Sequence, residues 1–225
     1  EKFSAKKAYL LGELGNDYDQ GLLTFFEQAF DGDVVKDSFP KDTSDFSTYL
    51  NKAVAEGCDV IFCPVSIAYS TQIVKLAASM GLETPILGGD TLDSNMVLEA
   101  AANSKVQLFV STFYQEGGAP DFDSGIKAWL AKDSTAMTNN GGNDTIAAVT
   151  AMGYDAYYTA LEALKAAGSV NAADVKAALP GVTYTGVSGA IAFDATGDAV
   201  RDTAYIKVAD TANNVWALET TQTVK

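Results

Sequence analysis

The residues best suited to chemistry form the stretch Pro85-Ile86-Leu87-Gly88-Gly89-Asp90-Thr91. Its apolar start, led by a proline, predicts a short buried strand, and the two glycines let the backbone turn sharply. Asp90 then stands just past the end of the strand. In an open α/β sheet, ligands collect outside the carboxyl ends of the strands. We therefore expect Asp90 to face such a crevice, with a helix-cap or turn aspartate as the alternative.

The sequence offers little for catalysis. It contains no histidine, and it lacks a GxSxG elbow, a P-loop and a GxGxxG motif that opens a helix. Acidic pairs could transfer protons, but nothing sets two of them apart. The segment Asp194–Asp198 lacks the alternating acidic spacing and the closing glutamate of a calcium loop. We therefore expect no enzyme, no metal and no other cofactor.

The two cysteines, Cys58 and Cys63, flank a predicted strand. Five extended steps separate them by about 16 Å, whereas a disulfide needs Cα atoms within about 7 Å. They are therefore predicted to be free, buried thiols. Without histidine or a CxxC motif, the sequence does not favour a zinc site.

Composition limits the class of protein. The chain has 225 residues, of which 48% are hydrophobic and 20% charged, as in ordinary globular proteins of one large or two small domains. A net charge of −14 repels phosphate backbones and anionic lipids, so we expect no nucleic-acid or membrane-surface role. No apolar run approaches the roughly 18 residues of a membrane-spanning helix. Glu1-Lys2-Phe3-Ser4 leads almost directly into a strand, so we expect no signal peptide in this sequence.

Strands and helices are predicted to alternate over the first half of the chain. The predicted strands are Lys7–Gly12, Val34–Phe39, Val60–Cys63, the stretch before Gly88, and Val106–Thr112. The predicted helices start at Asp19, behind a cap at Thr43 or Ser44, at about Tyr69 (ending at Gly81), and behind a cap at Ser94. Such alternation predicts an α/β fold: a parallel sheet with helices on both faces.

The pattern changes after Phe113. A linker-like stretch, Glu116–Pro120, precedes helical periods at Phe122–Lys132, Thr145–Ala167 and about Ala172–Leu179, with a polar loop predicted at Ser134–Asp144. Short strands are predicted at Ala190–Phe193, Ala204–Val208 and Val215–Glu219. No strands alternate with these helices, so we expect the sheet on which they pack to lie elsewhere.

Seven motifs along the chain occur in an order that resembles a known family. They are Asn16–Gly21, Asp42–Phe46, Cys58–Phe62, Pro85–Asp90, Gly153-Tyr154-Asp155-Ala156, Gly186-Val187-Ser188-Gly189 and Phe193–Asp198. In this order they resemble the type 1 periplasmic binding proteins of branched-chain amino acid (leucine/isoleucine/valine) ABC transporters. Each motif alone is weak, but the resemblance covers nearly the whole chain.

The resemblance implies a two-lobed protein that closes on its ligand. Residues 1–113 would form the second lobe, 114–200 a mainly helical crossover segment that packs on the first lobe, and 201–225 the returning strands of the second lobe. Members of the family begin with a first-lobe segment before the strand at Lys7–Gly12. We therefore expect the sequence to be a fragment that lacks this segment and, with it, the family's loop that binds the ligand carboxylate.

The resemblance also assigns residues to a ligand site. Asp90 matches the acidic position that takes the ligand's α-ammonium group. Tyr18 matches an aromatic contact, although Asp19 replaces the usual glycine beside it; alternatively, Tyr18 merely covers the start of a helix. Ser66 stands where the family often has an aromatic residue, so either the pocket is roomier or Tyr69 substitutes for it. A plain helix cap explains Ser66 equally well.

The fifth candidate is Tyr154, which matches a pocket tyrosine on the returning helix. A helical core stripe that includes Tyr157 and Tyr158 is the alternative explanation for it.

The implied function is that of an extracytoplasmic solute-binding protein, in the periplasm or on the cell surface as a lipoprotein. It would bind an amino acid or a related amine-bearing ligand without reaction and deliver it to the permease subunits of an ABC transporter. A ligand-sensing domain of a receptor or regulator shares the fold, and a downstream membrane-spanning or DNA-binding segment would identify it. A flavodoxin-like enzyme fragment with carboxylate chemistry is a third possibility, which turnover of a small substrate would identify.

Overall fold

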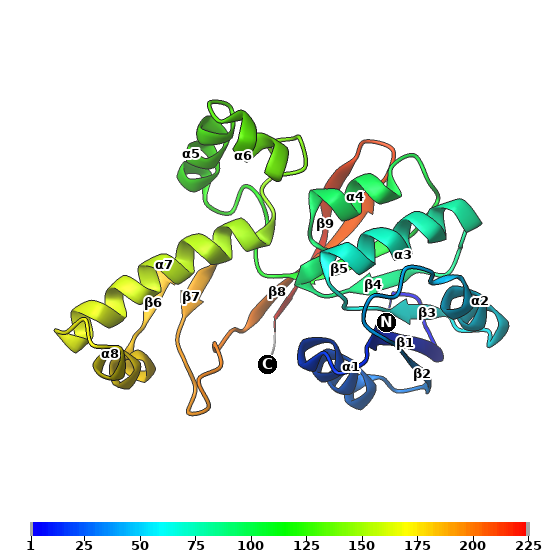
Figure 1. The fold of residues 1–225 in the computed structure, drawn as a ribbon, viewed down its shortest axis with the longest axis horizontal. Coiled ribbons are helices and arrows are strands. Elements are labelled where there is room, and N and C mark those ends of the chain that lie inside the picture. Colours follow the sequence, from blue (N-terminus) through cyan, green and yellow to red (C-terminus); the bar gives the residue numbers. More distant parts are fainter. Residues whose placement is uncertain (1, 224–225) are drawn as a thin grey trace. The chain divides into compact units, whose positions relative to one another are not determined.

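The computed structural model describes residues 2–223 and divides into two compact units (Figure 1). Unit 1 contains residues 2–112 and Ile206–Thr220, and unit 2 contains Phe113–Tyr205 with residues 221–223. Each unit has its own hydrophobic core.

Unit 1 alternates strands and helices, as the sequence predicts. Its strands are β1 (Lys7–Glu13), β2 (Asp33–Phe39), β3 (Val60–Phe62), β4 (Ile86–Gly88) and β5 (Leu108–Thr112). Its helices are α1 (Asp17–Ala29), α2 (Ser47–Ala55), α3 (Ile67–Met80) and α4 (Asn95–Ala101), with a 3-10 turn, η1 (Asp90–Leu92), directly after β4.

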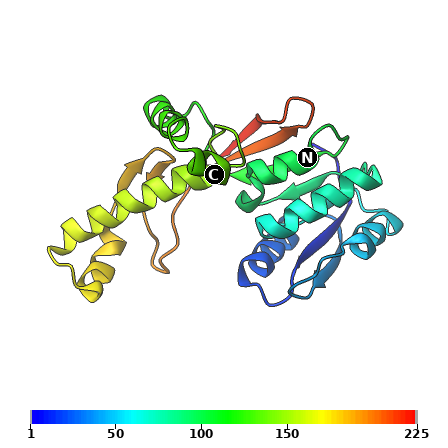
Figure 2. The same ribbon diagram turned by 45° about the horizontal axis from the view of Figure 1, so that its top comes forward.

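The strands join in one sheet of order β2-β1-β3-β4-β5-β8-β9. The first five pair in parallel, which confirms the predicted α/β fold. The strands β8 (Thr203–Asp210) and β9 (Val215–Thr223) extend the sheet beyond β5. They are the orange-to-red hairpin in Figure 2.

Both faces of this sheet are covered. Along β1, Tyr9 and Leu11 join a core with side chains of α2, α3 and α4, whereas Ala8 and Leu10 join a second core that includes Leu23 of α1. Strands buried on both faces need apolar residues at every position, which explains why these segments are continuously apolar.

Capping chemistry accounts for where several helices begin and end. The Ser94 side chain accepts a hydrogen bond from the amide of Met96 at the start of α4. Gly81, with φ at 63°, ends α3 in the left-handed conformation that glycine adopts without strain. Both predicted boundaries are confirmed.

The predicted cap at Thr43 or Ser44 is wrong. Helix α2 begins at Ser47, and the Asp45 carboxylate accepts a hydrogen bond of 2.9 Å from the amide of Ser47. Because Asp45 already supplies an acceptor at this end, the helix does not extend back to the earlier hydroxyl residues.

The cysteines are both free and buried, as predicted. Cys58 precedes β3 and Cys63 follows it.

Unit 2 is mainly helical. It contains α5 (Pro120–Leu130), α6 (Ser134–Asn139), α7 (Ala148–Ala167), α8 (Ala172–Ala178), a 3-10 turn η2 (Leu179–Gly181), and the antiparallel pair β6 (Tyr184–Gly186) and β7 (Gly189–Ile191). Its core consists of Tyr114, Phe122, Ile146, Ala148 and Ala151. Within residues 2–223, no helix combines the length and apolarity needed to cross a membrane.

Two predictions for this segment are wrong. The polar loop expected at Ser134–Asp144 contains the helix α6, because the Asp133 carboxylate caps it by accepting hydrogen bonds from the amides of Thr135 and Ala136. The strand β6 was not predicted, since its three residues are too few to show an alternating pattern.

Candidate functional site

Three neighbouring strands of unit 1 bring the first candidate residues to one edge of the sheet. Tyr18 lies in the first turn of α1 after β1, Ser66 precedes α3 after β3, and Asp90 opens the turn after β4. Strands β1, β3 and β4 are adjacent and parallel, so their carboxyl ends meet at the same edge. This is where open α/β sheets bind ligands.

Asp90 and Tyr18 are in direct contact. The Tyr18 hydroxyl donates a hydrogen bond to Oδ1 of Asp90. Asp90 is half-buried, and 41% of Tyr18 remains exposed. Burial of the hydroxyl, followed by its hydrogen bond to Asp90, raises the pKa of Tyr18 well above the ordinary value. At neutral pH the Tyr18 phenol beside Asp90 is therefore neutral.

The two glycines before Asp90 are required by close packing. A Cβ on Gly88 would overlap the side chain of Leu92, which folds back over the strand end. A Cβ on Gly89 would lie 3.0 Å from the Tyr18 hydroxyl and 3.3 Å from Leu22. The Gly-Gly pair therefore allows the turn that carries Asp90 to approach both β4 and α1.

Ser66 is the half-buried residue just before α3, but its side chain makes no capping hydrogen bond. The loop that holds it is tied to the Asp90 turn, because Thr91 Oγ1 donates a 2.8 Å hydrogen bond to the carbonyl of Val65. Ser66 thus lies beside the Asp90 turn without being needed as a cap.

Tyr69 makes its contacts at the ends of β1 and β2. Its ring packs against Phe39 and Phe46, and its hydroxyl accepts a 3.0 Å hydrogen bond from the amide of Asp42. The same hydroxyl donates to Glu13 at 3.4 Å. These contacts give Tyr69 a structural role at the edge of the core.

Asp19 is a buried carboxylate whose role the sequence did not reveal. Only 1% of it is exposed, and its Oδ2 accepts a 2.8 Å hydrogen bond from the amide of Glu13. Its Oδ1 has no hydrogen-bond partner among the described residues. Burial, and secondly the charge of Glu13, raise the pKa of Asp19, against the lowering effect of that hydrogen bond. Asp19 therefore fixes the loop between β1 and the helix that carries Tyr18.

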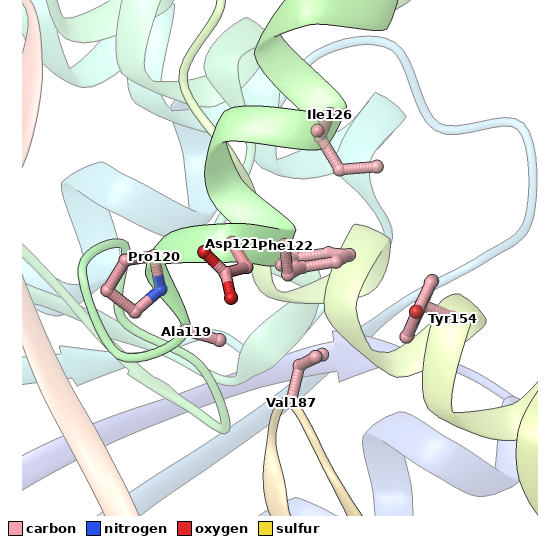
Figure 3. Close-up of a pocket in the computed structure, with 8 residues that line it drawn as sticks. Ala119, Pro120, Asp121, Phe122, Ile126, Tyr154 and Val187 are labelled. Carbon is pink, nitrogen blue, oxygen red and sulfur yellow. The ribbon is translucent and has the colours of Figure 1, made fainter.

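Tyr154 belongs to unit 2, on α7. It lines a pocket of about 490 Å³ together with Phe122, Ile126, Val187 and Asp121 (Figure 3). The rings of Tyr154 and Phe122 lie 5.0 Å apart, and 38% of Tyr154 is exposed. The pocket offers an aromatic and aliphatic wall with one carboxylate at its rim.

Two of the sequence motifs meet in unit 2. Asp155, which is 1% exposed, accepts 2.8 Å hydrogen bonds from the amides of Val187 and Ser188. Its carboxylate lies so close to Gly186 that a Cβ there would overlap it. The Gly153–Ala156 motif therefore anchors the turn between β6 and β7, and Asp155 in it is structural.

The strand-end site carries groups that suit the recognition of a ligand. Within residues 2–223, no three acidic or cysteine side chains are arranged to hold a metal ion. The strand-end site presents a carboxylate, a phenol and a hydroxyl group, which suits a hydrogen-bonding, positively charged ligand group.

Solved structures of similar fold include several solute-binding proteins. The leucine-binding protein LivK from Thermotoga maritima is 25% identical, with a TM-score of 0.81 over 99% of this chain and 62% of that one. LivJ from Streptococcus pneumoniae, solved in complex with isoleucine, is 26% identical, with a TM-score of 0.74 over 100% of this chain and 62% of that one. A solute-binding protein from R. palustris in complex with benzoate is 18% identical, with a TM-score of 0.80 over 99% and 60%.

This chain thus spans less than two thirds of the length of these proteins. No curated protein sequence matches it. A family model described as "Periplasmic binding protein" matches residues 1–213. The members of this family are binding proteins, and the family name refers to the periplasm, which lies outside the cytoplasm. Together with the parallel sheet and its helices, this match establishes that the chain belongs to the periplasmic binding protein family and has the type 1 fold.

Proposed function

We propose that this chain is part of the solute-binding protein of an ABC importer and that it binds an amino acid reversibly. The observation that carries the proposal is the half-buried Asp90 carboxylate at the strand ends, held by the Tyr18 hydroxyl. The similarity to a leucine-binding protein and to a protein solved with isoleucine supports a branched-chain or related amino acid as the ligand.

In this proposal Asp90 accepts hydrogen bonds from the ligand's ammonium group. A charge-assisted hydrogen bond of this kind contributes about 1.5–3 kcal/mol. The Tyr18 hydroxyl orients the carboxylate, and Ser66 lines the rim of the site. In unit 2, Tyr154 stays a predicted ligand contact, and it lines the pocket described there. We do not assign a contact to Tyr69, because its hydroxyl is already bonded to Asp42 and Glu13.

The protein would bind its ligand without transforming it. Family membership supports this, since the family consists of binding proteins. It would work outside the cytoplasm, in the periplasm or at the cell surface, and its macromolecular partners would be the permease subunits of the transporter.

We further propose that unit 1 is the second lobe of a two-lobed protein and that unit 2 belongs with the first lobe. Along α7, Val149 and Tyr157 are 51% and 62% exposed. The same helix and β7 line an apolar groove of about 340 Å³ that includes Met152, Ile191 and Phe193. Further polypeptide, equivalent to the part of the relatives that this chain does not span, would cover this surface and supply the groups that bind the ligand's carboxylate.

A titration followed by NMR tests the proposed function. The ¹⁵N-labelled chain is titrated with each common amino acid at millimolar concentrations, which detects weak binding by half of a site. We expect branched-chain amino acids to shift the amide signals of Tyr18, Ser66 and Asp90. If no amino acid shifts these signals, or if the shifts lie only elsewhere, the proposal is wrong. A parallel incubation in which the amino acid is chemically altered would support the enzyme alternative instead.

A further inference from the structure

A buried ion pair lies one turn beyond Asp90. Asp93 and Lys207 are each 2% exposed, and the Lys207 Nζ lies 2.9 Å from Oδ2 of Asp93. Thr112, which is 0% exposed, donates a 2.8 Å hydrogen bond from Oγ1 to the same carboxylate oxygen. Asp93 lies in the turn after β4, Lys207 in β8 and Thr112 at the end of β5. Three separate segments of the chain therefore meet at Oδ2 of Asp93.

Such a pair constrains geometry strongly. The desolvation of two charges offsets much of their attraction, so a buried ion pair is weak evidence for stability. Removing one partner, however, leaves a buried charge without its counter-ion, which is strongly unfavourable. Asp93 therefore holds its place against Lys207, and the backbone that carries Asp93 is held with it.

That backbone is the turn that presents Asp90. The amide of Asp93 donates a 3.0 Å hydrogen bond to the carbonyl of Asp90, which closes the 3-10 turn η1. Between them Leu92, 1% exposed, fills the space that the missing Cβ of Gly88 leaves open. A shift of Asp93 would thus move Asp90 and loosen its contact with Tyr18.

The ion pair also lies where the chain passes between its two units. Thr112 is the last residue of unit 1 before Phe113, and Lys207 is the second residue after the chain returns at Ile206. The Asp90 turn is therefore attached to both strands by which the backbone leaves and re-enters unit 1.

We propose that Lys207 is a positioning residue for ligand binding. By pairing with Asp93, Lys207 fixes the turn that carries the Asp90 carboxylate. The pair also joins this turn to β5 and β8, the strands by which the chain leaves and re-enters unit 1. The inference rests on the proposed role of Asp90 for its functional meaning, but its structural part can be tested without any ligand.

The test uses the Tyr18 hydroxyl as a reporter of the position of Asp90. The 225-residue chain is labelled with ¹³C at Cζ of tyrosine, and the Tyr18 signal is assigned with Tyr18→Phe. Because the hydroxyl is buried and bonded to Asp90, which raises the pKa of Tyr18, the parent signal should not titrate between about pH 8 and 10.5. In Lys207→Met we expect the pKa of Tyr18 to fall below that of the parent, so that its signal titrates at a lower pH, because the contribution of the hydrogen bond to Asp90 is lost while that of burial remains.

Two further variants separate positioning from general support. In Lys207→Met/Asp93→Asn both charges are gone and the introduced amide oxygen can still accept from Thr112, so we expect the Tyr18 signal to return towards that of the parent. Lys52→Met, which removes an exposed partner of Asp37, should leave the signal unchanged. Should Lys207→Met fail to fold, Lys207→Gln, which keeps a donor without the charge, takes its place with the same expected result.

The inference is overturned if the folded Lys207 variant keeps the parent's Tyr18 signal, or if the double variant behaves like the single one. Titration with L-isoleucine then adds the functional arm, where we expect the Lys207 variant to bind about tenfold more weakly than the parent. If the Tyr18 signal responds as expected but the parent binds no amino acid, the proposed function fails while the positioning role of Lys207 stands.

Discussion

The two compact units differ in how completely they bury their own apolar surface. In unit 1, a parallel sheet is covered on both faces. Tyr9, Leu10 and Leu11 of β1, which is the second strand in the sheet order, are 0% exposed. In unit 2, the long helix α7 leaves Val149 and Tyr157 more than half exposed, although α8 and the short β6–β7 hairpin lie beside it (Figure 1).

This difference indicates which interactions stabilise each unit. A sheet buried on two faces derives its stability from apolar burial. A two-stranded hairpin is only marginally stable alone, so unit 2 depends more on specific polar contacts such as those of Asp155 with Val187 and Ser188. Four predictions test this contrast, in order of decreasing effect.

The largest effect should come from a core truncation in unit 1. Ile73→Ala removes a side chain that is 1% exposed, and we expect a loss of about 3 kcal/mol in the free energy of unfolding. The matched truncation in unit 2, Val149→Ala, should change it by less than about 0.5 kcal/mol, because Val149 is already exposed. Urea unfolding followed by Trp216 fluorescence in a Trp129→Phe background reports on unit 1, and Trp129 fluorescence in a Trp216→Phe background reports on unit 2. Equal losses of unfolding free energy in the two variants would contradict the proposed difference between the units.

Removal of the Asp155 carboxylate should destabilise unit 2 locally. Asp155→Ala leaves the amides of Val187 and Ser188 without their acceptor, which costs about 2 kcal/mol. Hydrogen exchange at Tyr184–Ile191 should accelerate accordingly, while exchange in β1 stays unchanged. Asp174→Ala, at an exposed position on α8, serves as the control. Uniform acceleration across both units would contradict the assignment of Asp155 to unit 2 alone.

Matched glycine substitutions should have opposite signs in the two units. Gly88→Ala places a Cβ against Leu92 and should destabilise unit 1 by about 2 kcal/mol. Gly153→Ala lies within α7 with no heavy atom within 4 Å of the added Cβ, so it should stabilise the helix by about 0.5–1 kcal/mol. Thermal unfolding of the two variants measures both effects, and a destabilising Gly153→Ala would show that α7 is more closely packed than described.

Relief of a buried charge should give the smallest effect. Burial raises the pKa of Asp19 in the folded protein above its unfolded value, so the ionised group costs stability at neutral pH and the cost disappears once both states are protonated. Asp19→Asn keeps the acceptor for the Glu13 amide and should raise the free energy of unfolding of unit 1 at pH 7. The gain should vanish below about pH 4. Exposed Asp17→Asn is the control, and a gain that persists in acid would refute this cause.

The sequence predicted unit 1 well because its signals are local. Alternating apolar strands and amphipathic helices predict a parallel sheet. Ser94 marks the start of a helix because its side chain caps it, and Gly81 marks the end of one because a residue without a side chain adopts the left-handed conformation. The position of Asp90 at a strand end followed from the Gly-Gly turn alone. The contact of Asp90 with Tyr18 requires that β1 and β4 lie on the same sheet with only β3 between them, which is a tertiary fact.

The features that sequence reasoning missed depend on distant residues. Nothing near Asp93 or Lys207 indicates that residues 114 positions apart form an ion pair. The burial of Asp19 was hidden because a carboxylate in the first turn of a helix is usually a solvated residue that favours the helix dipole. In unit 2, the turn of β6 and β7 is specified by Asp155, more than 30 residues earlier.

The central claim is that Asp90 binds the ammonium group of an amino acid, and a comparison of two ligands tests it directly. L-Isoleucine and 3-methylpentanoate differ by the amine alone, and each is titrated by NMR into the parent and into Asp90→Asn. We predict that the parent binds isoleucine at least about tenfold more tightly than 3-methylpentanoate and that Asp90→Asn abolishes this preference. If the parent binds both ligands equally, or if Asp90→Asn keeps the preference for the amine, Asp90 does not hold the ligand's ammonium group.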